Sequence, residues 1–329
     1  MMEARVLSGM RPTGKLHFGH YHGVLVNWLR LQKEYECFFF VADWHALTTD
    51  YAAPKGIKDN VREMLLDWLS VGIDPKKATI FRQSAIKEHA ELFVLLSMIT
   101  PLPWLERNPT YKEQLEEIRD KDLHTFGFLG YPVLQTADII VYKAAKVPVG
   151  IDQAPHLELS REITRRFNHF YGEVFPEPQT LLTESPKVLG TDGRKMSKSY
   201  NNAVLLSDPP EVVEKKMLQM MTDTARKRRT DPGNPDRCPL YITFHLLYSD
   251  NKTLEWVREG CTQAKIGCTE CKRSVIPKVL EMLGPIQKRR KEFEANPALL
   301  DDILREGSIK ASKVAQKTMT DVRKAMGLE

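Results

Sequence analysis

Residues 5–20 read RVLSGMRPTGKLHFGH, and this stretch decides the expected fold. Its apolar start predicts a buried strand, and the turn rich in glycine and histidine leads directly into a helical pattern. Open α/β sheets bind their ligands at this point, between the carboxyl end of a strand and the N-terminus of the next helix. The glycines let the backbone approach a nucleotide closely, and the imidazoles of His17 and His20 can donate to phosphate oxygens. We therefore predict a nucleotide-binding turn, with a loop of surface histidines as the alternative.

Outward from this stretch, the first half of the chain alternates short apolar runs with helical patterns. Apolar runs typical of strands buried on both faces occupy residues 4–8, 37–42, 79–81 and 146–149. Between them, apolar side chains recur at helical spacing, as in the stripe Val61, Leu65, Trp68 and Leu69. This alternation predicts an α/β fold with a doubly wound parallel, Rossmann-like nucleotide-binding domain over residues 1–207.

The second half of the chain has a different character. Strand signals fade after residue 207, and prolines and glycines separate helical stretches. We expect a helical domain at residues 208–296 and a C-terminal helical segment at residues 297–329 that packs back on the body.

Composition and charge narrow the class of protein. The 329 residues are 42% hydrophobic, and no run approaches the roughly 18 apolar residues of a membrane span. The N-terminus also lacks the layout of a signal peptide, so we expect a cytoplasmic protein without a membrane partner. The net charge of +5 lies after residue 207, where 23 Lys and Arg oppose 18 Asp and Glu, while 25 oppose 25 before it. The basic runs at 226–229 and 288–291 either attract a polyanion or form solvated faces.

A second loop suited to an anionic ligand lies at residues 190–199, which read GTDGRKMSKS. Its last five residues, together with the HFGH of residues 17–20, resemble the two signatures of class I aminoacyl-tRNA synthetases. Further phrases resemble the bacterial tryptophanyl members of that family, at residues 9–14, 42–48, 147–153 and 156–159. The resemblance covers essentially the whole chain. It also implies that the helical domain binds the tRNA anticodon.

The resemblance implies a two-step reaction. The carboxylate of L-tryptophan attacks the α-phosphate of ATP, pyrophosphate leaves, and the 2′-hydroxyl of the terminal adenosine of tRNA(Trp) then takes the aminoacyl group. Neither step needs a protein nucleophile, so catalysis would rest on positioning and on charge stabilisation, with Mg²⁺ sharing the phosphate charge. The expected catalytic residues are His17, His20, Lys195 and Lys198. The expected ATP-binding residues are Arg11, Pro12, Thr13, Gly19, His20, Gly150, Ile151, Asp152, Val188, Lys195, Met196, Ser197, Lys198 and Ser199. Lys112 either reaches phosphate as well or is a solvated lysine.

The helix expected near Gly130 bears on which amino acid the protein takes as its substrate. Tyr131, Gln135 and Asp138 are spaced i, i+4 and i+7 and therefore share one face. A carboxylate on an otherwise apolar helix needs a donor, and the resemblance places the indole N–H of tryptophan opposite Asp138. A neighbouring Arg or Lys is the alternative partner. Because the three residues also resemble the tyrosine pocket of the sister enzyme, tyrosyl-tRNA synthetase stays open as the alternative function.

The cysteines suggest a metal centre. Cys238, Cys261, Cys268 and Cys271 are separated by 22, 6 and 2 residues, and such clustering in an intracellular chain favours ligation over disulfides. The spacing resembles that of a subset of bacterial tryptophanyl enzymes with a [4Fe–4S] cluster; zinc and four unligated thiols are the alternatives. Cys37, inside an apolar run, is expected to be an inert core thiol.

Two other classes of function remain to be tested. A small-molecule nucleotidyltransferase shares the first motif but lacks the second, and a non-catalytic paralogue that only binds RNA has no need of both motifs. The family implies a homodimer with ATP, L-tryptophan and tRNA(Trp) as partners. We expect no DNA partner.

Overall fold

The computed structural model describes residues 4–117, 121–150, 154–182 and 186–329. At its centre is a five-stranded parallel sheet with the order β3-β2-β1-β4-β5. The strands are β1 (Arg5–Met10), β2 (Glu36–Val41), β3 (Ala78–Arg82), β4 (Lys146–Val149) and β5 (Gln179–Leu182). The four predicted strands are confirmed. The prediction missed β5, because its four residues form neither a long apolar run nor a clear alternation.

The strand order indicates where along the edge of the sheet a ligand would bind. From β1 the chain builds outward through β2 and β3, and it then returns to lay β4 on the other side of β1. The connections therefore leave β1 and β4 in opposite directions, and a crevice opens at the carboxyl ends of these two strands. The predicted doubly wound parallel fold is confirmed, and the first motif follows β1 directly into this crevice.

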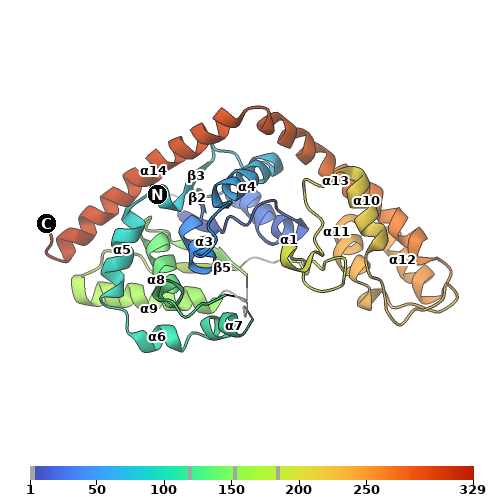
Figure 1. The fold of residues 1–329 in the computed structure, drawn as a ribbon, viewed down its shortest axis with the longest axis horizontal. Coiled ribbons are helices and arrows are strands. Elements are labelled where there is room, and N and C mark those ends of the chain that lie inside the picture. The colour runs from blue at the N-terminus through green and yellow to red at the C-terminus, as the bar shows by residue number, and fades with distance from the viewer. Residues whose placement is uncertain (1–3, 118–120, 151–153, 183–185) are drawn as a thin grey trace.

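Helices cover both faces of the sheet (Figure 1). They are α1 (Phe18–His20), α2 (Val26–Leu31), α3 (Asp43–Asp50), α4 (Ile57–Val71), α5 (Glu88–Ser97), α6 (Leu102–Glu106), α7 (Pro109–Glu117), α8 (Phe126–Ile140), α9 (Ala154–Tyr171), α10 (Pro210–Gln219), α11 (Leu246–Tyr248), α12 (Asn251–Thr262), α13 (Cys268–Glu294) and α14 (Pro297–Ala325). Shorter helical turns occupy Tyr21–Leu25, Gln83–Ala85, Lys198–Tyr200, Pro235–Arg237 and Tyr241–His245.

Helix α4 forms where its apolar stripe predicted a helix. The stripe is buried against the sheet, where Trp68 meets Trp28 edge to face and Trp28 stacks on Phe39 of β2 at 4.2 Å between ring centroids. The helix ends at Gly72, whose φ of 112° lies in the left-handed region that favours glycine. Because side chains alternate along a strand, Phe38 and Phe40 point to the opposite face of the sheet and join the core under α5 and α8.

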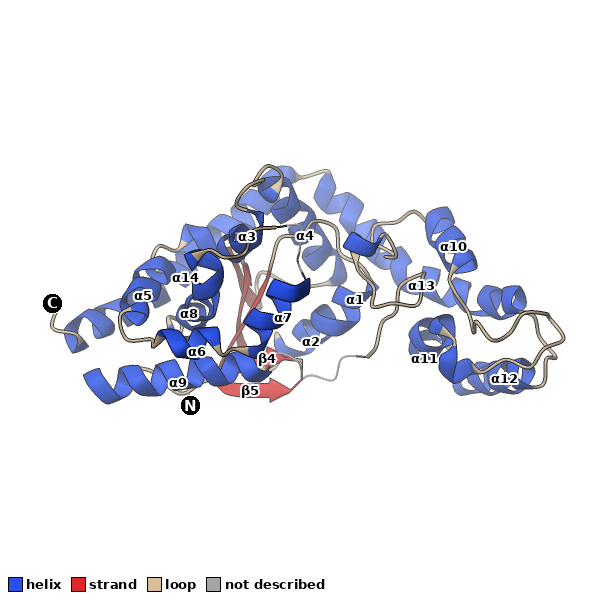
Figure 2. Cartoon of the chain, turned by 60° about the horizontal axis from the view of Figure 1, so that its bottom comes forward, coloured by secondary structure: helices blue, strands red, loops and turns tan. Residues whose placement is uncertain are grey.

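The remaining helices form a lobe beside the sheet and an arch along one edge of the molecule. Figure 2 shows the lobe, built from α10 to α13, extending away from the sheet. Helices α13 and α14 form an arch along the top of the molecule in Figure 1, and α14 packs on β3 and α5. At Gly307 the backbones approach so closely that a Cβ atom would lie 1.8 Å from the Ile80 carbonyl oxygen, so only glycine fits there. Among the described residues, no helix is long and apolar enough to cross a membrane.

Candidate active site

A pocket of about 370 Å³ opens at the carboxyl ends of β1 and β4. Its walls come from β1, from the turn that follows β1, from α3 and α8, and from the end of β4. Tyr131, Gln135 and Asp138 of α8 all line it, as the spacing i, i+4 and i+7 predicted for one helix face. The apolar lining includes Leu7 and Phe128. The pocket therefore lies at the switch point of the sheet and presents one carboxylate within a mainly apolar wall.

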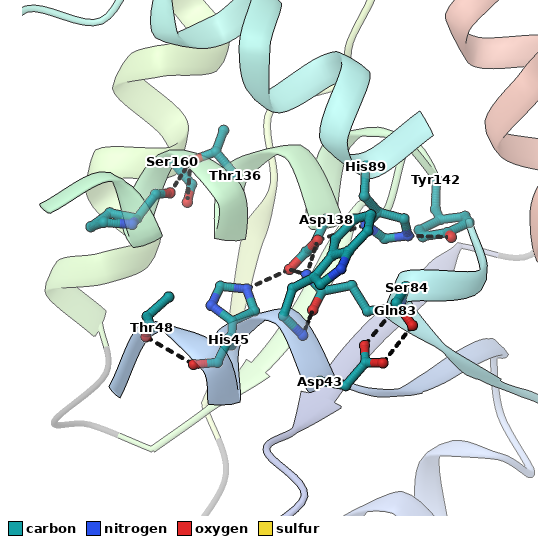
Figure 3. A network of polar contacts seen from close by, with 12 residues as sticks. Asp43, His45, Thr48, Gln83, Ser84, His89, Thr136, Asp138, Tyr142 and Ser160 are labelled. Carbon is teal, nitrogen blue, oxygen red and sulfur yellow. Dashed lines mark hydrogen bonds and ion pairs between the residues drawn. The ribbon is translucent and has the colours of Figure 1, made fainter. Parts of the chain in front are cut away.

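Asp138 is the centre of a buried hydrogen-bond network (Figure 3). Its carboxylate accepts from His45 Nε2 at 2.7 Å, from His89 Nδ1 at 2.6 Å, and from Gln83 Nε2 at 2.8 and 3.0 Å. The expected alternative, an Arg or Lys partner, is wrong, because two imidazoles and an amide supply the donors. Burial opposes ionisation, but the charges and hydrogen bonds of His45 and His89 lower the pKa of Asp138 below its ordinary value. The pocket thus holds an ionised acceptor.

The neighbours of Asp138 are themselves oriented. Gln83 Oε1 accepts from the backbone N–H of Trp44 at 3.1 Å, and this bond turns the Gln83 amide nitrogen toward Asp138. His89 is fully buried, and its Nε2 lies 2.7 Å from the Tyr142 hydroxyl. Sequence reasoning missed Gln83, His89 and Tyr142. The available signal was the position of Gln83 directly after β3, at the carboxyl edge of the sheet where ligand-binding groups gather.

The two histidines of the first motif are poised as neutral donors. His17 Nδ1 accepts from the Gly19 N–H at 3.0 Å, and His20 Nδ1 accepts from the His17 N–H at 3.3 Å. Burial, and then the Lys198 charge, lowers the pKa of His17 to about 4; burial, His17 and Lys198 lower that of His20 to about 3. Each ring is therefore neutral at pH 7 and carries its proton on Nε2. Both Nε2–H groups can donate to phosphate.

The second motif contacts the first. Lys198 Nζ donates to the Thr13 carbonyl, to Thr13 Oγ1 at 3.3 Å and to the Lys15 carbonyl at 2.9 Å. Lys195 and Ser199 are exposed beside this contact. The side chains of Val188 and Met196 are buried in the core, so only their backbone atoms are available to a nucleotide. The structure therefore brings together two loops that lie about 180 residues apart in the sequence.

The other predicted ATP residues are placed as follows. Arg11 lines the pocket and donates to Thr49 Oγ1, and its buried Nε has no hydrogen-bond partner among the described residues. Gly150 lies at the rim of the same pocket. Ile151 and Asp152 lie outside the described residues. Lys112 is exposed on α7.

The four cysteines meet in the lobe, away from the ATP motifs. Arg226 Nη1 lies 3.9 Å from Cys261 Sγ and 4.0 Å from Cys268 Sγ, and His245 Nε2 lies 3.3 Å from Cys271 Sγ. Burial, and then the nearby charges of the other three cysteines, raises the pKa of Cys271 to about 12. Within the described residues, no group of three or more His, Cys, Asp or Glu side chains is arranged to hold a metal ion. Cys37 lies in the core, and burial is the main reason that the pKa of its thiol is raised to about 12.

Comparison with known proteins decides the family. Residues 2–284 match the family described as tRNA synthetases class I (W and Y). The tryptophan–tRNA ligase of Thermotoga maritima is 53% identical over 98% of this chain and 99% of its own length. That of Ralstonia nicotianae is 48% identical over 100% of this chain and 99% of its own length. The chain belongs to the tryptophan–tRNA ligases.

Solved structures agree with this assignment of the ligase. Tryptophanyl-tRNA synthetase from Campylobacter jejuni, complexed with ADP and tryptophan, superposes with a TM-score of 0.88 at 32% identity, over 98% of this chain and 100% of that one. Tyrosyl-tRNA synthetase from Archaeoglobus fulgidus is 22% identical with a TM-score of 0.66, which shows a shared fold only. The predicted enzyme class, an aminoacyl-tRNA synthetase, and the predicted function, a tryptophan–tRNA ligase, are confirmed.

The ligase should lose stability in mild acid. Burial lowers the pKa values of His17, His20, His22 and His245 to about 3 or 4, whereas histidines of the unfolded chain titrate near their ordinary value of about 6.5. Between about pH 6.5 and pH 4 the unfolded chain binds protons that the folded chain does not, so the free energy of unfolding falls as the pH falls. Urea unfolding at pH 7, 6 and 5 measures this slope.

Two variants separate this effect from general acid sensitivity. His22→Gln should make the slope shallower, because it removes one of the four buried histidines. His124→Gln, at an exposed position, should leave the slope unchanged. A free energy of unfolding that is constant from pH 7 to pH 5 contradicts the prediction.

Proposed function

We propose that the chain activates L-tryptophan with ATP, giving tryptophanyl-adenylate and pyrophosphate, and then transfers tryptophan to the 2′-hydroxyl of the terminal adenosine of tRNA(Trp). One observation carries the proposal: the ionised carboxylate of Asp138 faces a mainly apolar pocket of about 370 Å³, which Arg11 of the turn after β1 also lines. An indole ring fits such a wall, and its single N–H needs one buried acceptor.

Asp138 is the proposed acceptor for the indole N–H. A carboxylate offers about four acceptor sites. Asp138 accepts from three side chains, and one of them, the Gln83 amide, donates to both oxygens. The side chain of His45 is 12% accessible and that of Asp138 is 1% accessible, and both line the pocket. The substrate would therefore approach the carboxylate from the pocket, beside the His45 ring. Tyr131 and Gln135 would contact the same substrate from the same face of α8.

The phosphates of ATP are proposed to lie between the two motifs. The Nε2–H groups of His17 and His20 would donate to phosphate oxygens while staying neutral, and the ammonium groups of Lys195 and Lys198 would offset the charge that develops as pyrophosphate leaves. Bound with ATP, Mg²⁺ would share that charge. Lys198 already contacts the first motif, so binding of ATP would exchange its carbonyl acceptors for phosphate oxygens.

Exchange of pyrophosphate into ATP, measured with each of the standard amino acids in turn, tests this function. Exchange with tryptophan alone supports the proposal. Exchange with tyrosine would mean that Tyr131 and Gln135 determine the specificity, and an absence of exchange with any amino acid would contradict adenylate formation.

We also propose that Cys238, Cys261, Cys268 and Cys271 hold a [4Fe–4S] cluster, with zinc as the alternative. The charges around the thiols support an anionic centre. Lys272 is buried and donates only to the carbonyls of Leu218 and Met220, and neither it nor Arg226 forms a salt bridge within the described part of the chain. Cations without a counter-ion are costly to bury, and four thiolates on a cluster would supply the missing negative charge.

Among the described residues, no group of three or more His, Cys, Asp or Glu side chains is arranged to hold a single ion such as zinc, which binds four sulfurs at about 2.3 Å each. At Gly233 a Cβ atom would lie 2.7 Å from Cys261 Sγ, so this glycine keeps the space beside the sulfur clear. When bound, the cluster would link α12 to α13 through iron–thiolate bonds and would offset the Arg226 and Lys272 charges.

Removing one ligand tests the centre. Cys268→Ser should lose bound iron and sulfide after anaerobic reconstitution, and it should weaken tRNA charging far more than pyrophosphate exchange, because the site lies in the lobe. Cys37→Ser is the matched control and should keep its iron, since Cys37 lies in the sheet. Zinc in place of iron would favour the alternative, and equal loss of charging and exchange would indicate unfolding instead.

We further propose that the protein works in the cytoplasm as a homodimer. Large apolar side chains remain exposed on the helices beside the sheet, among them Met98 at 70%, Phe126 at 67%, Leu102 at 56% and Phe170 at 50%. Exposed apolar surface of this kind commonly marks a protein interface, and a second copy of the chain is the proposed partner.

A further inference from the structure

We propose that Asp67 is a positioning residue for adenylate formation, through which the C-terminal part of α13 holds the two ATP motifs against each other. This inference rests on the proposed role of those motifs. It concerns residues that lie behind the active site, none of which lines the pocket.

Asp67 holds the first motif by its backbone. The side chain of Asp67, on α4, is fully buried, and Oδ2 accepts from the backbone N–H of Leu16 at 2.6 Å. Leu16 directly precedes His17, the N-cap residue of α1, so this bond fixes the position of the backbone just before α1 begins. Burial raises the pKa of Asp67 to about 6, while the Arg290 charge and the Leu16 N–H act in the opposite direction, and the carboxylate is ionised at pH 7.

Arg290 of α13 holds Asp67 in turn. The Arg290 side chain is 5% exposed and pairs with Asp67 and Glu63 of α4 and, at 2.8 Å, with Glu294 of its own helix. Such a buried pair contributes little net stability compared with well-packed apolar side chains, because both charges lose their water. Its clearer consequence is geometric: it fixes the carboxylate that accepts from Leu16. The basic run at 288–291 is therefore not simply a solvated face.

The same face of α13 also reaches the segment after the second motif. Residues 16–18 pair antiparallel with residues 204–206, through Phe18 N to the Val204 carbonyl at 3.2 Å and Leu206 N to the Leu16 carbonyl at 2.9 Å. Gln287, one turn before Arg290, donates to the Leu206 carbonyl at 3.2 Å and to the Asp208 carbonyl at 2.8 Å. Helix α13 therefore contacts one partner of the pairing directly, through Gln287, and holds the other partner through the Arg290–Asp67 ion pair.

Loss of this support should affect catalysis more than substrate binding. The reacting groups act only when His17, His20 and Lys198 face the same phosphate, and a displacement of about 1 Å can lower a rate by about 100-fold. Asp67 does not line the proposed tryptophan pocket. The signature of positioning is therefore a lower kcat with an unchanged affinity for tryptophan.

The test compares three variants in ATP–pyrophosphate exchange, with tryptophan binding measured by calorimetry. Asp67→Ala should lower kcat by about 10- to 100-fold and leave the Kd for tryptophan within twofold. Asp67→Asn should recover part of the rate, because its amide oxygen can still accept from the Leu16 N–H. Glu63→Gln, which removes a second carboxylate from Arg290 without touching Leu16, should stay close to the wild-type kcat.

A kcat that falls equally in Asp67→Ala and Glu63→Gln, or that does not fall in Asp67→Ala, overturns the inference. If Asp67→Ala does not fold, Gln287→Ala takes its place: Gln287 is partly exposed, and its loss should lower kcat without changing tryptophan affinity, whereas an unchanged kcat again overturns the inference. Wild-type protein that shows no exchange with any amino acid would instead refute the proposed function.

Discussion

Asp138→Asn should lower kcat/KM for tryptophan by about 100- to 1,000-fold. The substitution removes the negative charge from a hydrogen bond to the indole N–H, and bonds to charged groups contribute about 1.5–3 kcal/mol. It also places an amide N–H against one of the donors from His45, Gln83 or His89, which leaves a buried donor without an acceptor. Together these effects amount to about 3–4 kcal/mol, and about 1.4 kcal/mol corresponds to each factor of ten. Steady-state exchange with varied tryptophan measures the loss.

Thr136→Ala is the matched control for Asp138→Asn. Thr136 is also buried on α8, but its hydroxyl donates to the Pro132 carbonyl and lies 3.0 Å from the Ser160 hydroxyl, away from the pocket. Its loss should change kcat/KM by less than about tenfold, because one neutral hydrogen bond contributes about 1 kcal/mol. A similar loss in both variants would show that the buried polar groups of α8 act on the stability of the helix and not on tryptophan.

Lys195→Ala should lower the rate of adenylate formation by about 100- to 1,000-fold and leave tryptophan affinity nearly unchanged. Lys195 is exposed in the second motif and is proposed to supply a cation where charge develops on the leaving pyrophosphate, and loss of one such group typically lowers kcat by about this factor. Lys195 does not line the pocket under α8 that is proposed to bind tryptophan. Single-turnover adenylation and calorimetry separate the two effects.

Lys187→Ala is the control for Lys195→Ala. Lys187 is an exposed lysine shortly before the second motif, and its loss removes the same charge without changing the motif. It should react at the wild-type rate. Equal rates in both variants and the wild type would remove Lys195 from the proposed mechanism, and equal losses would point to the net charge of the loop as the cause.

Much of the active site could be predicted because its signals are local. The apolar runs that form β1 to β4 and the stripe of α4 reflect the periods of strands and helices, so they appear within a few consecutive residues. The same is true of the face shared by Tyr131, Gln135 and Asp138. The side chains of Val188 and Met196 show the limit of such signals, since the motif predicted them for ATP and packing buries both in the core.

The sequence by itself determined the parallel α/β fold, the two motifs, the family and the face of α8 that lines the pocket. Only the tertiary structure decided what surrounds those residues. The donors to Asp138 come from α3, from the turn after β3 and from α5, at sequence separations of 93, 55 and 49 residues, and Arg290 meets Asp67 across 223 residues. A buried charge takes its partners from whichever elements packing brings within about 3 Å. That choice depends on the arrangement of the whole sheet and its helices, and no local period of the sequence records it.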